Sequence, residues 1–179
     1  TQSSGSTAVT EGGNTDSYTV ELTSEPTGDV NIVLGVGAQL SLSPPNLIFT
    51  SLDWNVAQTV IVTATNDVVV EGPHSANISH STSSSDSNYS GIPVAGINVA
   101  ITDNDSAVVQ FAPASVSQTE ASSPMPFTLT LSNPVASGVS FNVGSLIGTA
   151  SVADFTPISG TFSFPANNNS PQTINVVIN

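Results

Sequence analysis

The most constraining feature of this 179-residue sequence is that two segments about 109 residues apart read alike. In each segment a glutamate, an aromatic residue and a leucine stand at matching positions: Glu11, Tyr18 and Leu22, then Glu120, Phe127 and Leu131. A later run, Gln58–Val62, returns as Gln172–Val176. A repeat of this length is a whole domain and not the unit of a solenoid. The sequence therefore predicts two successive copies of one domain, at residues 1–105 and 106–179.

Short runs rich in β-branched and aromatic residues alternate with clusters of glycine, proline, asparagine and serine. Runs of this kind predict β-strands joined by turns. The expected strands are at residues 17–23, 30–36, 46–49, 58–64, 74–81 and 96–102 in the first copy, and at 107–111, 127–131, 138–143, 160–164 and 172–178 in the second. Twelve prolines and 13 glycines oppose any long helix. The predicted fold class is all-β, with tandem immunoglobulin-like antiparallel β-sandwiches.

The second copy lacks counterparts of the last two strands of the first. A sandwich without these strands exposes a strand edge and an apolar face, and both associate readily in water. We therefore expect the gap to be filled by following sequence or by a strand from a neighbouring copy. The predicted open edge is at residues 172–178, and the candidate donor strand is at residues 1–9.

Charge excludes several classes of partner. The chain has 13 acidic residues and no lysine or arginine, which gives a formal net charge of −13. Such a chain cannot neutralise phosphates, so nucleic acid is excluded, and attraction to anionic lipid fails for the same reason. Only 7% of residues are charged and 38% are apolar, so the sequence is that of a folded domain with an affinity for cations.

The chain has no cysteine, which excludes disulfides and thiolate metal sites. No apolar run reaches the 18 residues of a membrane-spanning helix, so we expect no direct membrane insertion. A surface rich in serine, threonine and asparagine, without basic residues, favours an extracellular or cell-surface protein.

Several segments have a pattern that is specific to one family. They are residues 148–155, 159–166 and 171–178 in the second copy, and residues 47–60 and the tail from Ser83 to Asp103-Asn104-Asp105 in the first. These segments resemble Calx-β repeats of bacterial-type extracellular surface proteins. It implies an immunoglobulin-like sandwich of two antiparallel sheets, repeated in tandem. In calcium-binding members of that family, acidic residues from several loops gather at one end of the domain.

Carried over residue by residue, the resemblance implies a set of calcium ligands. These are Glu11, Asp67, Glu71, Asp103 and Asp105 in the first copy, and Glu120 and Asp154 in the second. Asn66 and Asn104 replace carboxylates of the family pattern, and His74 stands where a further glutamate would help. Calcium takes six to eight oxygen ligands, so the site would be a weak one. The alternative is that these residues only form turns, as Asp and Asn commonly do.

Other chemistry has little support in the sequence. His74 and His80 are in no catalytic spacing, and no Gly-x-Ser-x-Gly motif is present, so we expect no enzyme. Trp54 could provide a platform for a sugar or could close one end of a sandwich, and the second role fits its loop position better.

The sequence as a whole predicts a non-enzymatic extracellular structural or adhesive repeat module, stiffened by calcium at the domain junction. One alternative is a self-assembling surface filament subunit, completed by strand exchange with a neighbour. Another is a carbohydrate-binding accessory domain of a secreted enzyme. The expected partners are other copies or repeats of the same protein, and surface glycans or other surface proteins.

Overall fold

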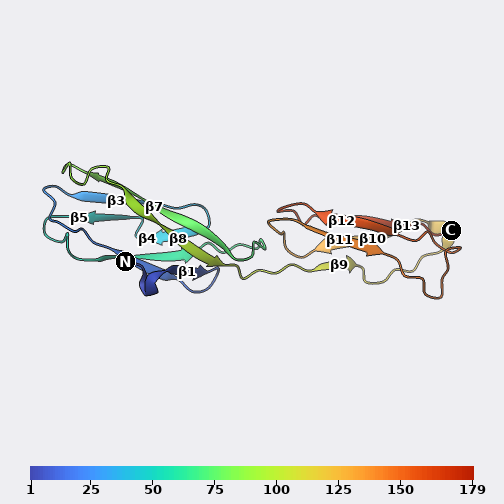
Figure 1. The fold of residues 1–179 in the computed structure, drawn as a ribbon. Helices are drawn as coiled ribbons and strands as arrows, with labels where there is room; N and C mark the ends of the chain where they lie inside the picture. The colour runs from blue at the N-terminus through green and yellow to red at the C-terminus, as the bar shows by residue number, and fades with distance from the viewer. The chain divides into compact units, whose positions relative to one another are not determined.

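Every element of regular structure longer than one turn is a β-strand (Figure 1). The computed structural model describes all 179 residues and contains no α-helix, only two short 3-10 turns, η1 at Ser3–Gly5 and η2 at Glu120–Ser122. Accordingly, no helix has the length and apolarity that crossing a membrane requires. The predicted all-β fold class is confirmed.

The chain divides into two units. The first comprises Thr1–Asp67 and Gly72–Asn104, and the second comprises Val68–Glu71 and Asp105–Asn179. The short segment Val68–Glu71 belongs to the second unit because Val70 forms a bridge with Val135 there. The Val70 N–H donates to the Pro134 carbonyl, and the Val70 carbonyl accepts from the Ala136 N–H, each at 2.9 Å.

The first unit is a sandwich of two sheets. Its strands are β1 (Thr7–Thr10), β2 (Asp16–Val20), β3 (Val30–Gly35), β4 (Leu40–Ser43), β5 (Asn46–Phe49), β6 (Gln58–Ala64), β7 (His74–Ser84) and β8 (Val94–Thr102). One sheet has the order β1-β8-β7-β3-β5 and the other the order β2-β6-β4. All pairs are antiparallel except β1 with β8, which is parallel.

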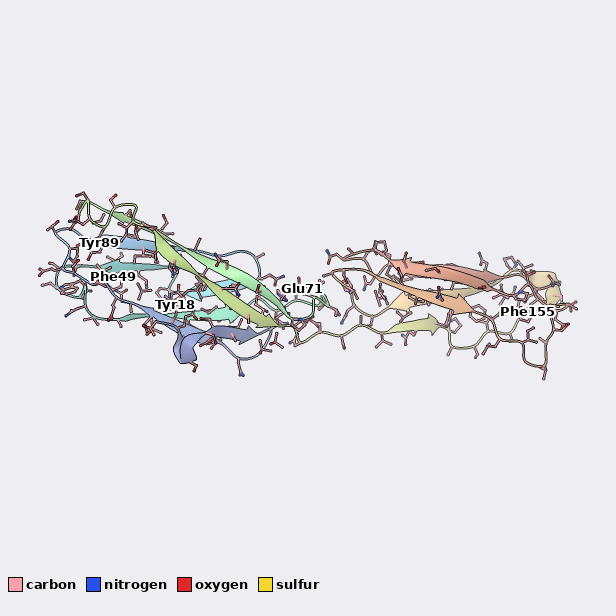
Figure 2. The ribbon with its side chains drawn as sticks, viewed as in Figure 1. Tyr18, Phe49, Glu71, Tyr89 and Phe155 are labelled. Atoms are coloured by element: carbon pink, nitrogen blue, oxygen red, sulfur yellow. The ribbon has the colours of Figure 1, made fainter.

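Alternating apolar residues of both sheets form the core of the first unit. Tyr18 and Val60 come from one sheet, and Phe49 and Ile78 from the other, and all four are buried. Tyr18 and Phe49 are labelled in Figure 2. Tyr89, in the loop between β7 and β8, is also buried in this core, and its hydroxyl donates to the Ser24 carbonyl at 2.6 Å. The period-two alternation of the sequence is thus the pattern that fills the space between the sheets.

The second unit has fewer strands. They are β9 (Val109–Ala112), β10 (Met125–Leu131), β11 (Val139–Gly144), β12 (Ser159–Phe164) and β13 (Gln172–Val176). They form a three-stranded sheet with the order β13-β10-β9 and a two-stranded sheet of β11 and β12. The buried core consists of Leu129, Leu131, Phe164 and Ile174.

Strand pairing shows which elements correspond in the two units. Phe127 pairs with Ile174 between β10 and β13, as Tyr18 pairs with Val60 between β2 and β6. Val139 pairs with Phe164 between β11 and β12, as Val30 pairs with Phe49 between β3 and β5. Strands β7 and β8 have no counterpart in the second unit, as predicted.

The predicted donor strand is wrong for this chain. Thr7–Thr10 pairs with Val99–Thr102 of its own unit, and Gln2 forms a bridge with Tyr18. Residues 1–9 are therefore already used within the first unit. No tight hairpin joins Thr7–Thr10 to β8, and the run is short. Only its pairing with a strand distant in the sequence therefore identifies it as a strand.

The predicted edge at β13 is an edge of its sheet, but the strands that the second unit lacks do not belong there. In the first unit β7 pairs with β3, which corresponds to β11 and not to β13. The missing neighbours would therefore lie along β11. Ile178, which follows β13 in the sequence, forms a bridge with Phe155. This bridge corresponds to the pair of Ala64 in β6 with Leu40 in β4 in the first unit. Phe155 is labelled in Figure 2.

Candidate metal centre

Parallel pairing brings the ends of β1 and β8 together at one end of the first unit. Thr10 lies opposite Thr102, and the Glu11 N–H donates to the Thr102 carbonyl at 3.0 Å. Parallel strands end at the same edge of a sheet. The residues that follow them, Glu11 after β1 and Asp103 after β8, therefore lie at the same end. The connection between β6 and β7, which carries Asp67 and Glu71, reaches the same end.

Two asparagines hold this end together. The Asn104 Nδ2 donates to the Glu11 carbonyl at 2.9 Å and to the Asn66 Oδ1 at 3.1 Å. Gly12 has a φ of +58°, and a Cβ on it would lie 2.7 Å from the Asn66 Oδ1. A glycine is therefore required where the two amides approach. Asn104 acts here as a donor, which a carboxylate could not do.

Three of the predicted ligands come together around Glu11. Carboxylate oxygens of Glu11, Asp67 and Asp105 lie within 4.8 Å of one another. Glu11 is only 1% exposed, whereas Asp67 is exposed and Asp105 is partly buried. Burying an ionised carboxylate is costly unless a cation or several hydrogen bonds compensate. The group offers only oxygen atoms, which are the ligands that calcium prefers.

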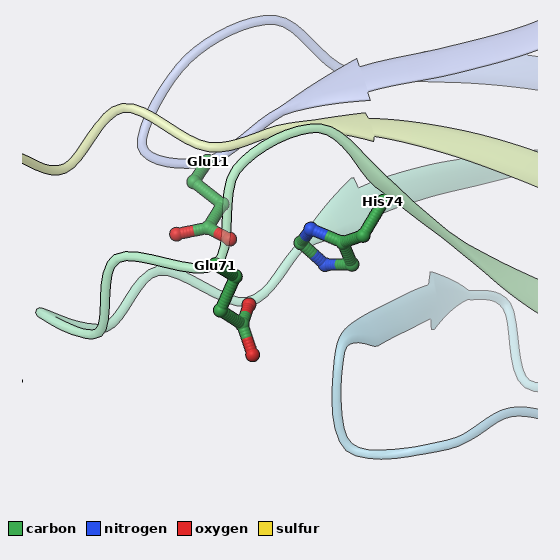
Figure 3. Close-up of side chains that lie close together, drawn as sticks. All are labelled: Glu11, Glu71 and His74. Carbon is green, nitrogen blue, oxygen red and sulfur yellow. The ribbon is translucent and has the colours of Figure 1, made fainter. Parts of the chain in front are cut away.

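A second group also includes Glu11. Ligand atoms of Glu11, Glu71 and His74 lie within 4.8 Å of one another, and Figure 3 shows the three side chains close together. The His74 Nδ1 is 2.9 Å from the Gly72 carbonyl and donates a hydrogen bond to it. A mixed nitrogen and oxygen set suits a transition metal better than calcium.

Asp103, a further predicted ligand, forms a hydrogen bond to the backbone. Its Oδ2 accepts a hydrogen bond from the Gly72 N–H at 2.7 Å. This bond ties the start of the segment leading into β7 to the end of β8. Asp103 belongs to neither group of three, and its hydrogen bond positions the loop that carries Glu71 and His74.

The two candidates of the second unit lie apart from any such group. Glu120 begins η2 and is exposed. The Asp154 Oδ2 accepts from the Ser151 N–H at 2.7 Å and from its hydroxyl at 2.9 Å. These hydrogen bonds hold the pKa of Asp154 below its ordinary value. Asp53 accepts from the N–H and hydroxyl of Thr50 in the same way, so both aspartates stabilise turns.

Two further side chains from the sequence analysis have packing positions. Trp54 is partly buried against the core of the first unit, and its carbonyl accepts from the Leu22 N–H at 2.9 Å. His80 lies on β7, with its Nε2 3.2 Å from the Tyr18 hydroxyl. Tyr18 is a buried core residue, so the partly buried His80 packs against the sandwich interior.

Comparison with known proteins yields similarity in structure only. No family model matches the chain, and no curated protein matches it. Two solved structures similar to this chain are CBD12 from CALX1.2 (18% identity, 98% of this chain, 73% of that chain, TM-score 0.41) and the calcium binding domain CBD12 of CALX1.1 (17%, 98%, 73%, 0.39). The CsuC-CsuE chaperone-tip adhesion subunit pre-assembly complex of Acinetobacter baumannii matches about as well (11%, 95%, 94%, 0.42).

Proposed function

We propose that this chain is a non-enzymatic, extracellular structural or adhesive module that binds calcium at one end of its first unit. The observation that carries the proposal is the nearly complete burial of Glu11 within 4.8 Å of the oxygens of Asp67 and Asp105. The chain contains no lysine or arginine to neutralise these charges. A cation from solution would relieve the repulsion between the three carboxylates.

Calcium is the cation that the three oxygens suit best. It takes six to eight oxygen ligands in a flexible geometry, and backbone carbonyls and water can complete the shell. Three carboxylates are few for a tight site. We therefore expect a dissociation constant on the order of 10⁻⁴ to 10⁻³ M, in the range of extracellular calcium modules.

Two of the proposed ligands stand at unit boundaries in the sequence. Asp67 is the last residue of the first unit before the segment Val68–Glu71, and Asp105 is the first residue of the second unit after Asn104. Calcium would act as a stiffening element of the array and take part in no reaction.

Thermal unfolding tests this proposal. With calcium at about ten times its dissociation constant, mass action stabilises the folded state by roughly 1.4 kcal/mol. For a domain of this size, each kcal/mol of added stability raises the Tm by about 4–8 °C. We expect the Tm of the first unit to be higher in calcium than in chelator.

Variants identify the ligands. The double variant Asp67→Asn and Asp105→Asn should abolish the calcium-dependent rise in Tm. The matched control is Glu120→Gln, which removes an exposed carboxylate outside both groups and should keep the rise. An equal Tm in calcium and in chelator, or a rise that survives the double variant, would show that these carboxylates only form turns.

A third variant separates calcium from transition metals. His74→Gln removes the only nitrogen ligand of the group Glu11, Glu71 and His74. It should leave the calcium response unchanged and remove any stabilisation by zinc. Loss of the calcium response in this variant would contradict the assignment of calcium to Glu11, Asp67 and Asp105.

A further inference from the structure

The first and the last strands of the first unit, β1 and β8, are direct neighbours in one sheet (Figure 1). Their pairing is parallel and runs from Thr7 opposite Val99 to Thr10 opposite Thr102. The chain therefore enters this ladder at one end, at Thr7, and leaves it at the other end, at Thr102. Every other strand pair of the unit is antiparallel.

This parallel pair determines how the unit responds to tension along the chain. Tension pulls β1 by its N-terminal end and β8 by its C-terminal end. Because the strands are parallel, these two ends point in opposite directions, and the tension slides one strand along the other. The hydrogen bonds between the strands lie across this direction, so they are loaded together and not one after another.

The antiparallel hairpin of β7 and β8 would respond differently. His74 at the start of β7 lies opposite Ile101 near the end of β8, so the chain enters and leaves this hairpin at the same end. Tension applied to such a pair opens it one residue pair at a time. In the first unit the tension passes directly from β8 to β1, and the hairpin is loaded only after β1 has come away.

Hydrogen bonds hold β1 along both of its edges. On the edge that faces β8, the N–H of Glu11, which follows the strand, donates to the Thr102 carbonyl at 3.0 Å. On the other edge, the Ala8 N–H donates to the Asp16 Oδ2 at 2.9 Å. Strand β1 is therefore fixed to both sheets of the sandwich.

Burial protects this ladder from water. The inward side chains Thr7 and Val9 of β1 and Val99 and Ile101 of β8 are all buried, at 2% exposure or less. Hydrogen bonds beside a packed core are stronger than bonds in water, because the local dielectric is low and water does not compete for the donors and acceptors.

We infer that β1 and β8 form a mechanical clamp, through which the first unit resists tension along the chain. Forced unfolding is governed by the rate of unfolding and therefore by its barrier. The clamp raises this barrier because several hydrogen bonds must break together. This function goes beyond calcium binding, since the pairing of the two strands requires no ion.

Pulling from either end of β1 tests the inference. The chain has no cysteine, so Ser6→Cys and Asn14→Cys each provide a single attachment point at an exposed residue. Ser6 directly precedes β1, whereas Asn14 lies at the other end of the strand, where its carbonyl accepts from the Thr10 N–H at 3.0 Å. The second attachment is a peptide tag at the C-terminus in both variants.

The two variants differ in the direction of the tension. Tension from Ser6 slides β1 along β8. Tension from Asn14 leaves β1 unloaded and enters at the end of the sheet where β8 also ends, so it opens the strands from that end. The force at which the first unit unfolds should be at least about twofold higher from Ser6, because the bonds then break together.

Optical tweezers measure this force, and chelator in the buffer makes the result independent of calcium. Unfolding of the first unit should release roughly 300 Å of chain in either direction of pulling. Equal unfolding forces in the two variants, or a higher force from Asn14, would overturn the inference.

A disulfide across the ladder identifies the unfolding event. Ala8 and Ala100 are paired residues with exposed side chains, so the variant Ala8→Cys and Ala100→Cys places two thiols within reach of each other. With tags at both chain ends, the oxidised variant should lose the release of roughly 300 Å, and reduction should restore it. A release that persists after oxidation would show that β1 is not paired with β8 and would overturn the inference.

Discussion

Tyr18 and His80 form a neutral pair inside the first unit. Their rings are perpendicular with centroids 5.7 Å apart, and the Tyr18 hydroxyl lies 3.2 Å from the His80 Nε2. The His80 Nδ1 donates to the Ala95 carbonyl at 3.0 Å, so the Nε2 accepts from Tyr18. Burial raises the pKa of Tyr18 to about 12. Burial also lowers the pKa of His80 from its ordinary value of 6.5.

This pair predicts a stability that depends on pH. Because the folded pKa of His80 lies below 6.5, the unfolded chain binds its proton first as the pH falls. The contribution to stability is present above pH 6.5 and is lost as the pH falls through 6.5 toward the lowered folded pKa. Urea unfolding between about pH 7.5 and pH 5 should show a declining free energy of unfolding, in a range above the titration of ordinary carboxylates.

The variant His80→Gln should flatten this decline. A decline of equal slope in His80→Gln would mean that other groups cause it.

At the scale of the element, Asp16 at the start of β2 holds β1 in place. Its Oδ2 accepts from the Ala8 N–H at 2.9 Å and its Oδ1 from the Ser17 N–H at 2.7 Å, and the Ser3 hydroxyl also donates to it. These hydrogen bonds lower the pKa of Asp16, with that of Ser3 the largest cause. The parallel strand β1 is thus fixed by a side chain from the neighbouring sheet.

We therefore expect Asp16→Ala to loosen β1. The loss of its hydrogen bonds should cost about 1 kcal/mol, and the amides of Thr7–Thr10 should exchange faster than those of β7. Asp29→Ala, which removes the same charge from an exposed position, is the matched control and should change neither quantity. Unchanged exchange in β1 would show that the backbone pairing with β8 is sufficient without Asp16.

At the scale of the whole molecule, each unit has its own core. Sixteen buried side chains form the core of the first unit and four form that of the second. Hydrophobic stabilisation grows with the apolar area removed from water. The second unit should therefore be the less stable one, and calorimetry should show two transitions, the second unit unfolding first.

Single substitutions assign the transitions. Phe49 is 0% exposed in the first unit and Phe164 is 1% exposed in the second. Phe49→Ala and Phe164→Ala should each cost about 3–5 kcal/mol, the usual loss for a buried phenylalanine. Each should lower only the transition of its own unit. One merged transition that both variants lower equally would show that the chain unfolds as a single cooperative body.

The sequence by itself determined the fold class and most of the strands. Residues 46–49 and 58–64 were predicted with the bounds that the structure has, because apolar alternation and flanking turn residues are local properties. The strands Thr7–Thr10 and Leu40–Ser43 were not predicted. Each has four residues, and Leu40–Ser43 leads into Pro44-Pro45, which predicted a turn.

Only the tertiary structure decided which strands become neighbours. The parallel pairing of β1 with β8 joins residues about 90 positions apart, and no local pattern specifies it. That pairing sets Glu11 beside the end of β8, and the fold buries its carboxylate near Asp67 and Asp105. The pairing of β7 with β3 likewise shows that the strands missing from the second unit would lie along β11. Alternation determines which face of a strand is apolar, whereas its partner is chosen by the packing of the whole sandwich.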